Sequence, residues 1–248
     1  MSKFAAFAAL HVPGDPIVLF NAWDAGSAKA VAEAGAKAIA TGSWSVAAAY
    51  GFFDAEALPI DLAIENARRI VAAVDLPVTI DFEGGYASDP DETAANVARL
   101  AETDAIGCNF EDQVIGGDGL HMIADQAARI AAIRAGVGAE FFINARTDIF
   151  LKAKPETHDT VMIEDALDRA RAYADAGASG FFVPGLADLA LLETVTAASP
   201  LPVNAMAFPG SPTREEWAAA GVARISHGPG PYREAMAWLT EMARAAMG

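Results

Sequence analysis

Residues 79–86 read Thr-Ile-Asp-Phe-Glu-Gly-Gly-Tyr, an apolar run that ends in two carboxylates and a glycine pair. Two later stretches have the same character: Cys-Asn-Phe-Glu-Asp at 108–112 and Asn-Ala-Arg-Thr-Asp at 144–148. In each case a short apolar run gives way to polar residues, and an Ala-rich stretch follows. This order is typical of a buried parallel strand that leads into a helix.

Apolar runs of this kind recur along the whole chain. They are nearly continuous rather than alternating, which is typical of strands buried on both faces of a parallel sheet. We predict strands at Ile17–Trp23, Ala38–Gly42, Val78–Phe82, Ala105–Phe110, Phe141–Arg146, Gly180–Val183, Val203–Ala207 and Ala223–Ser226.

A helical segment is expected after each predicted strand. The expected starts lie near Ser27, Asp61, Asp91, Ile123, Met162, Asp188, Thr213 and Tyr232. Ser and Asp are typical first residues of helices, and Gly35, Gly177 and Gly221 stand where glycine commonly ends one. Eight strand–helix units in 248 residues favour a closed (β/α)8 TIM barrel over an open doubly wound sheet. We expect one barrel domain over residues 1–248, which begins with a short amphipathic helix.

Composition narrows the classes of function. Asp and Glu number 33 against 17 Lys and Arg, a net charge of −16, which disfavours nucleic acid and anionic membranes as partners. No Gly-x-Gly-x-x-Gly follows the first strand, and there is no P-loop. The single cysteine, Cys108, excludes an internal disulfide and is expected as a buried core thiol. No apolar run is long enough for a membrane span, and the start does not resemble a signal peptide, so we expect a cytoplasmic location.

Acidic side chains follow two neighbouring strands at the end where a barrel enzyme carries its active site. Asp81 and Glu83 are two residues apart and share a face of their strand, as Asn109 and Glu111 do on the next. Clustered carboxylates repel one another unless a cation lies between them. Oxygen ligands without His or Cys favour Mg²⁺ or Mn²⁺. The alternative is that these acids cap helices or pair with basic residues at the surface.

Two more features of the predicted strand ends suit an anionic substrate. Arg146 would offer a bidentate fork to a carboxylate. Residues 41–45, Thr-Gly-Ser-Trp-Ser, are small enough to let backbone amides approach a bound carboxylate, although a plain loop is the alternative.

These motifs, in this order, resemble the phosphoenolpyruvate mutase/isocitrate lyase family. The similarity is carried by Asn21-Ala22-Trp23-Asp24, TGSWS at 41–45, YGFFD at 50–54, TIDFEGGY at 79–86, NFED at 109–112 and NARTD at 144–148. It extends more weakly to the end of the chain. The resemblance implies an α/β barrel, a divalent metal, and an enolate of a pyruvate-like fragment formed while a C–C or C–P bond breaks or forms.

The resemblance also implies roles for individual residues. Asp81 would bind the metal directly, and Glu83, Glu111 and Asp54 would act largely through metal-bound waters. The substrate carboxylate would be held by Arg146 together with the amides near two further residues, Ser43 and Trp44.

Further candidates surround this set. Tyr50 could act as an acid or cover the site. Trp23, Asn144 and Asn204 are expected to contact the substrate, although the two asparagines could be purely structural.

The chain departs from the family pattern after the fourth strand. The segment 111–121 is short and lacks the lyases' Lys-Lys-Cys-Gly-His loop and the mutases' Lys and Asn-containing gate. Val183-Pro184-Gly185 stands where mutases place a His. These departures argue against isocitrate or methylisocitrate cleavage and against phosphoryl mutation. His121 and His227 could serve as acid or base, or could be structural.

Three hypotheses follow. The first is a Mg²⁺-dependent enzyme that cleaves or forms a C–C bond in a small 2-oxo or 2-hydroxy di- or tricarboxylic acid. The second is a C–P hydrolase or phosphonomutase on phosphonopyruvate-like acids, and the third a non-catalytic 2-oxo acid binding protein. The resemblance implies a homo-oligomer, a dimer or tetramer, in which the helix after Pro-Gly-Pro at 229–231 swaps between subunits; alternatively it packs on its own barrel.

Overall fold

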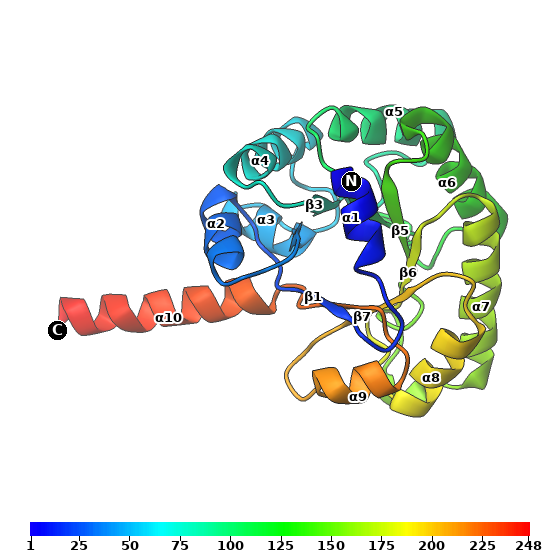
Figure 1. Cartoon of the computed structure of the whole chain (residues 1–248). Helices are drawn as coiled ribbons and strands as arrows, with labels where there is room; N and C mark the ends of the chain where they lie inside the picture. Colours follow the sequence, from blue (N-terminus) through cyan, green and yellow to red (C-terminus); the bar gives the residue numbers. More distant parts are fainter.

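The computed structural model describes residues 1–248, and its centre is an eight-stranded parallel barrel ringed by helices (Figure 1). The strands are β1 (Ile17–Leu19), β2 (Ile39–Ala40), β3 (Val78–Asp81), β4 (Gly107–Glu111), β5 (Phe142–Arg146), β6 (Gly180–Phe182), β7 (Val203–Met206) and β8 (Arg224–Ser226). They pair in the order β1-β8-β7-β6-β5-β4-β3-β2. A parallel bridge between Ala22 and Thr41 joins β1 to β2, so the TIM barrel predicted from the sequence is confirmed.

Ten α-helices accompany the strands. They are α1 (Lys3–Ala9), α2 (Ala25–Glu33), α3 (Ser43–Ala49), α4 (Ile60–Ala73), α5 (Pro90–Ala101), α6 (Ile123–Val137), α7 (Thr160–Asp175), α8 (Leu189–Ala198), α9 (Arg214–Ala219) and α10 (Gly230–Met247), with a short 3-10 helix η1 (Pro155–Thr157). Side-chain caps fix several starts: Asp24 and Thr213 form capping boxes, and Asp89 and Asp188 cap α5 and α8.

Helix α3 rules out the alternative of a plain loop after the second strand. It begins at Ser43, directly after Gly42, whose extended backbone turns the chain out of the barrel. The Ala run at 47–49 gives the segment its helix propensity, and the two serines before it obscured that signal. The helix points its first amide groups toward the carboxyl ends of the strands.

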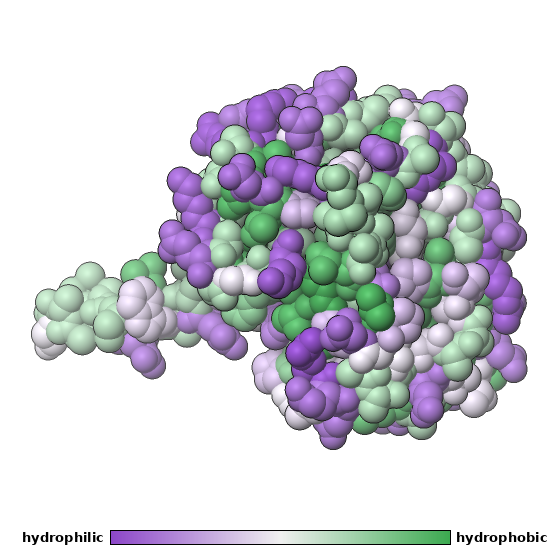
Figure 2. All heavy atoms as spheres, viewed as in Figure 1, coloured by the Kyte–Doolittle hydropathy of each residue, from purple (hydrophilic) through white to green (hydrophobic).

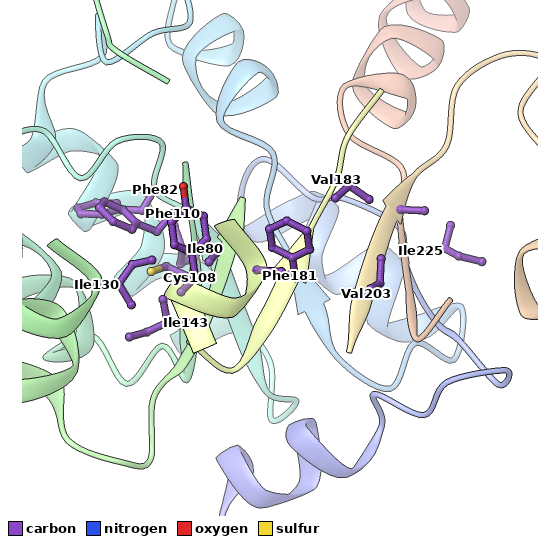
Figure 3. Close-up of a cluster of buried hydrophobic side chains, with 14 of the residues drawn as sticks. Ile80, Phe82, Cys108, Phe110, Ile130, Ile143, Phe181, Val183, Val203 and Ile225 are labelled. Carbon is purple, nitrogen blue, oxygen red and sulfur yellow. The ribbon is translucent and has the colours of Figure 1, made fainter. Parts of the chain in front are cut away.

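The main core lies between the barrel and its helices. Side chains on the outer faces of the strands, among them Ile80, Cys108, Ile143 and Phe181, are buried against the surrounding helices (Figure 3). Cys108 is fully buried, as predicted, and burial raises the pKa of its thiol.

A second, smaller cluster closes the amino end of the barrel. The predicted amphipathic helix is α1, and its Phe7 packs edge-on against Phe142 with ring centroids 5.1 Å apart. His11 stacks on the same Phe142 ring at 4.4 Å. These residues, with Leu19 and Ala40, form the floor of the barrel.

Helix α10 extends away from the barrel (Figure 1). Only Pro231 of this helix is buried, whereas Trp238 is 63% and Leu239 51% exposed. The alternative in which the last helix packs on its own barrel is therefore wrong. No helix of the chain combines the length and the apolarity that a membrane span requires.

Candidate active site

A cavity of about 160 Å³ opens at the carboxyl ends of the strands. Its lining comes from every strand end and from the start of α3. The lining residues are Asn21, Gly42, Ser43, Trp44, Asp54, Asp81, Asn109, Arg146, Leu151, Phe182, Met206, Ser226, Gly228 and Pro229.

Asp81 is held in place by three hydrogen bonds. Its Oδ2 accepts from the backbone amide of Ser43 at 3.1 Å, and its Oδ1 accepts from Asn109 Nδ2 at 3.3 Å. Its own amide donates to Thr41 Oγ1 at 2.9 Å. The carboxylate at the end of β3 is therefore fixed between the start of α3 and the neighbouring strand, facing the cavity.

Glu83 lies beside Asp81 but is buried, with 4% of its surface exposed. Its Oε2 accepts from the amide of Glu56 at 2.7 Å. Burial, and then the negative charge of Asp54, raises its pKa to about 8. The predicted tight turn follows, with the Gly85 amide donating to Phe82 O at 2.9 Å and Gly85 at φ +79°.

Asp54 reaches the mouth of the cavity from the loop between α3 and α4. Loss of hydration there, and then the charge of Asp81, raises the pKa of Asp54. Asp54, Asp81 and Glu83 thus form a cluster of carboxyl groups in which only Asp81 lies within 4 Å of a basic group, the Arg146 Nη1 at 3.9 Å.

Arg146 is bound on both sides by carboxylates. Its Nε and Nη2 donate to Asp148 at 2.6 and 2.8 Å, and its Nη1 lies 2.8 Å from Glu111 Oε2. Burial raises the pKa of Glu111, which Arg146 partly opposes. The expected bidentate fork thus engages Asp148, which follows two residues later, and Nη1 is the part that lies nearest Asp81, at 3.9 Å.

The layer beneath the cavity is a buried polar network. Asn109 Oδ1 accepts from Asn144 Nδ2 at 2.8 Å and from Arg224 Nη2 at 3.2 Å. Because both donors use its oxygen, the Asn109 amide nitrogen is turned toward Asp81. Burial lowers the pKa of Arg224 to about 9, and its Nη1 has no hydrogen-bond partner.

Sequence reasoning missed Asn21 and Arg224. Asn21 lines the cavity and accepts from the amides of His227 and Gly228 at 2.8 and 2.9 Å. Its position directly after a strand was the available signal. For Arg224, the signal was a lone cation inside an otherwise apolar strand.

The structure brings together most of the residues singled out in the sequence. Ser43, Trp44, Asp54, Asp81 and Arg146 line the cavity, and Glu83 and Glu111 lie immediately behind it.

Other candidates lie outside this lining. Asn144 belongs to the layer below, and Asn204 pairs there with Ser226 at 3.2 Å. Trp23 packs against Tyr232 with centroids 5.2 Å apart, and Tyr50 ends α3 at the surface.

Neither candidate histidine lines the cavity. The half-buried ring of His227 contacts Phe20, and His121 borders a separate small cavity with Arg129. No group of three or more His, Cys, Asp or Glu side chains is arranged as a preformed metal site.

The chain matches a known protein family along nearly its whole length. The family model described as phosphoenolpyruvate phosphomutase matches residues 7–247. An uncharacterised protein of Mycobacterium tuberculosis H37Rv is 37% identical, over 97% of this chain and 88% of its own. The 2-methylisocitrate lyase of Salmonella typhimurium LT2 is 30% identical, over 88% of this chain and 76% of its own.

Solved structures agree in fold. A Burkholderia cenocepacia J2315 protein, described provisionally as a phosphonomutase, superposes with a TM-score of 0.96, at 53% identity and 98% coverage of both chains. A phosphonopyruvate hydrolase solved with oxalate and Mg²⁺ superposes at 0.86, over 100% of this chain and 88% of the other; at 21% identity it shows the fold alone.

Proposed function

The chain belongs to the phosphoenolpyruvate phosphomutase family of lyases and mutases, and from that premise we propose that it is a Mg²⁺-dependent enzyme that cleaves or forms a C–C bond in a small 2-oxo or 2-hydroxy acid. The observation that carries the proposal is the fixed carboxylate of Asp81, which faces a closed-barrel cavity and is flanked by Asp54 and Glu83, neither of which forms an ion pair with a basic side chain.

The residues present fit a hard divalent cation. The donors are carboxylate oxygens, and the pKa values of Asp54 and Glu83 are raised first by burial and then by neighbouring carboxylates, two effects that a bound cation would offset. Asp81 would bind the metal directly, with Glu83, Glu111 and Asp54 acting through its waters. Bound Mg²⁺ would supply positive charge to the carboxylate and 2-oxo oxygens of the substrate. The Mg²⁺ in the similarly folded phosphonopyruvate hydrolase supports this choice of metal.

The chain's own residues would orient the substrate. Trp44, at the first turn of α3, and Arg146 line the cavity from opposite sides of Asp81 and would contact the carboxylate. Asn21 would hold the surrounding backbone in place, because its Oδ1 accepts from the amides of His227 and Gly228 and its Nδ2 donates to Thr41 O. The amide of Ser43 would act on Asp81 rather than on the substrate, because it already donates to that side chain.

The segment after Glu111 lacks both the lyases' loop and the mutases' Lys and gate, so it does not discriminate between the two reactions. C–C chemistry is favoured because a lyase is among the similar proteins. C–P chemistry on a phosphonopyruvate-like acid is the second candidate, supported by the similarity to the provisional phosphonomutase. Because the characterised relatives are enzymes, a purely binding role is set aside.

We further propose a homo-oligomer in which α10 of one copy lies on the barrel of another. The exit of α10 leaves an apolar groove beside β1, with Val12, Val18 and Phe20 in its lining. Val18 and Phe20 are 38% and 43% exposed, and Figure 2 shows hydrophobic atoms where Figure 1 draws β1. The exposed apolar side chains of α10, including Trp238, complement this groove in chemistry.

The experiment is to measure pyruvate, phosphate and CO2 release from a panel of 2-oxo, 2-hydroxy and phosphono acids, with Mg²⁺ and with a chelator. Metal-dependent release of pyruvate without phosphate is expected, and Asp81→Ala is expected to lower it about 100-fold or more. The exposed Asp91→Ala is the matched control. Metal-dependent phosphate release would instead establish the C–P alternative. Release unaffected by chelator and by Asp81→Ala would overturn the proposed site.

A further inference from the structure

Arg224 lies inside the barrel, directly beneath the cavity. Its neighbour Ile225 packs outward in the main core (Figure 3), so Arg224 and Ser226 point inward by the alternation of a strand. The Arg224 side chain crosses the barrel axis from β8 to the opposite strand, β4, where Nη2 donates to Asn109 Oδ1 at 3.2 Å. Its Nε donates to Ser226 Oγ at 3.3 Å. Both acceptors line the cavity, so the guanidinium group lies one side chain below the space for a ligand.

The positive charge of Arg224 is not neutralised by a neighbouring carboxylate. Arg224 is fully buried, no carboxylate lies within 4.0 Å of it, and its Nη1 has no hydrogen-bond partner. Arg146 and Arg169, by contrast, pair with carboxylates at 2.6 and 3.0 Å. Burial lowers the pKa of Arg224, and the negative charge of Asp81 opposes this effect. The charge on Arg224 therefore acts upward, on the floor of the cavity.

Hydrogen bonding alone does not require an arginine at this position. Asn109 Oδ1 also accepts from Asn144 Nδ2 at 2.8 Å, and Ser226 Oγ accepts from Asn204 Nδ2 at 3.2 Å. A neutral side chain in place of Arg224 would thus leave neither acceptor unpaired. An unpaired buried cation is unfavourable for folding. What arginine contributes here, and a neutral side chain would not, is positive charge.

The cavity above Arg224 has little positive charge of its own. Its ionisable lining residues are Asp54, Asp81 and Arg146, and Arg146 is itself held between two carboxylates. A divalent cation on Asp81 would neutralise that carboxylate, and the charge of Arg224 would then act on an anionic ligand above it. Inside a protein such an interaction is screened far less than in water.

We infer that Arg224 supplies positive charge to the underside of the cavity and strengthens the binding of ligands that carry, or develop, a second negative charge beside the metal. Arg224 touches no ligand atom and acts through its electric field. For a 2-oxo acid that passes through an enolate, this charge favours the enolate over the ketone. The inference rests on the proposed function, because it takes Asp81 as the metal ligand and the space above Asn109 as the ligand site.

The test compares oxalate with oxamate, which have nearly the same planar shape but carry two negative charges and one. Calorimetry in saturating Mg²⁺ measures both dissociation constants for the native protein and for Arg224→Met. We expect the variant to bind oxalate about tenfold more weakly and oxamate about threefold more weakly or less. Arg224→Lys keeps the charge and should stay within about threefold of the native protein for both ligands. Equal losses for the two ligands in Arg224→Met would overturn the inference, as would a lysine variant as weak as the methionine variant.

Two further measurements separate charge from structure. The affinity for Mn²⁺ alone, measured by electron paramagnetic resonance, should be unchanged or higher in Arg224→Met, because a nearby cation repels the metal. The urea midpoint of the same variant should be at least as high as that of the native protein, because a buried unpaired charge has been removed. Arg224→Gln, neutral but able to donate hydrogen bonds, should reproduce the ligand affinities of Arg224→Met. A fall in Mn²⁺ affinity as large as the fall in oxalate affinity would show that Arg224 only holds Asp81 in place, and would overturn the inference.

Arg171→Met is the matched control. It removes one positive charge from the exposed surface of α7, where Arg171 pairs with Asp168, and should leave both affinities unchanged. If the native protein binds oxalate with Mg²⁺ but the ratio of the two affinities is the same in Arg224→Met, the inference fails while the proposed function stands. If the native protein binds neither ligand with Mg²⁺, the proposed function fails and the inference fails with it.

Discussion

His11 is a buried titratable group far from the cavity. Its Nδ1 lies 2.9 Å from Phe7 O, its ring stacks on Phe142, and its Nε2 has no partner. Burial, with a further contribution from the positive charge of Arg224, lowers its pKa to about 3. The neutral ring fits the apolar floor of the barrel, and the protonated ring would not.

This group makes stability depend on pH. Between about pH 3 and the usual pKa of His, about 6.5, the unfolded chain binds a proton at this position that the folded chain does not. The contribution of His11 is therefore intact above pH 6.5 and is lost as the pH falls. From pH 7 to pH 5 we expect a loss of about 2 kcal/mol, measured by urea unfolding as the difference between the native protein and His11→Phe.

Taking that difference removes the contribution of the site carboxylates, because these titrate in both proteins. His158→Phe is a second control, since His158 Nε2 donates to Phe150 O outside the barrel floor. A difference between the native protein and His11→Phe that stays constant from pH 7 to pH 5 would contradict the assigned burial of a neutral ring.

Some positions in the site could be predicted from the sequence, and others could not. Asp81 and Arg146 could be placed together because strand ends in a barrel converge, whereas Asp54 followed only from the family resemblance. The partner of Arg146 could not be predicted, because Asp148 and a substrate carboxylate could both bind its guanidinium group. Only the side-chain geometry shows that Asp148 does so. The orientation of Asn109 depends on Arg224, a residue 115 positions later, and such a contact leaves no local pattern.

At the scale of elements, the loop between α3 and α4 is held to the loop after β3 by two side chains, Glu56 and Glu83. Glu56 donates its amide to Glu83 Oε2 and accepts from the Tyr86 amide on its Oε1 at 2.8 Å. Ala55 and Glu56 hold φ angles of 68° and 58°, a region that costs non-glycine residues free energy. The side-chain contact therefore holds a strained backbone in place and keeps Asp54 at the cavity.

We predict that Glu56→Ala loosens this loop. The Tyr86 amide would lose its acceptor, at a cost of about 1–2 kcal/mol, and amide hydrogen exchange over residues 51–59 should accelerate about tenfold or more. Glu56→Gln keeps an acceptor oxygen and should remain close to the native protein. Exchange rates that are equal in the Ala and Gln variants would show that the side chain does not hold the loop.

The elements themselves were largely predictable from the sequence. Their order follows from the alternation of continuous apolar runs with Ala-rich stretches, and starts such as those at Asp188 and Thr213 follow from capping chemistry. The strands β1 and β2 are shorter than predicted, because beyond Leu19 and Ala40 their pairing is reduced to the isolated bridge between Ala22 and Thr41. Helix α3 was missed because a short helix inserted after a strand has no counterpart in the simple strand–helix repeat.

At the scale of the whole molecule, α10 and the groove beside β1 are two exposed apolar surfaces of the same chain. We predict that the protein is an oligomer and that the double variant Trp238→Glu, Leu239→Glu dissociates it into folded monomers. Sedimentation velocity would measure the mass, and circular dichroism would check the fold. Glu241→Gln, an exposed change on the same helix, should leave the oligomer intact.

A native chain that sediments as a monomer would contradict this assembly. So would a double variant that retains the native mass. The sequence left the path of the last helix open because Pro-Gly-Pro at 229–231 permits either course, and only the fold shows that the helix departs.

The closed amino end of the barrel has a consequence for the order of product release. Phe7, His11 and Phe142 close the amino end, so the cavity has its doorway at the carboxyl ends alone. A substrate that enters there and is split in two must send both fragments back through the same doorway, one behind the other. The two products therefore leave one after the other. Slow release of the first product delays release of the second and binding of the next substrate.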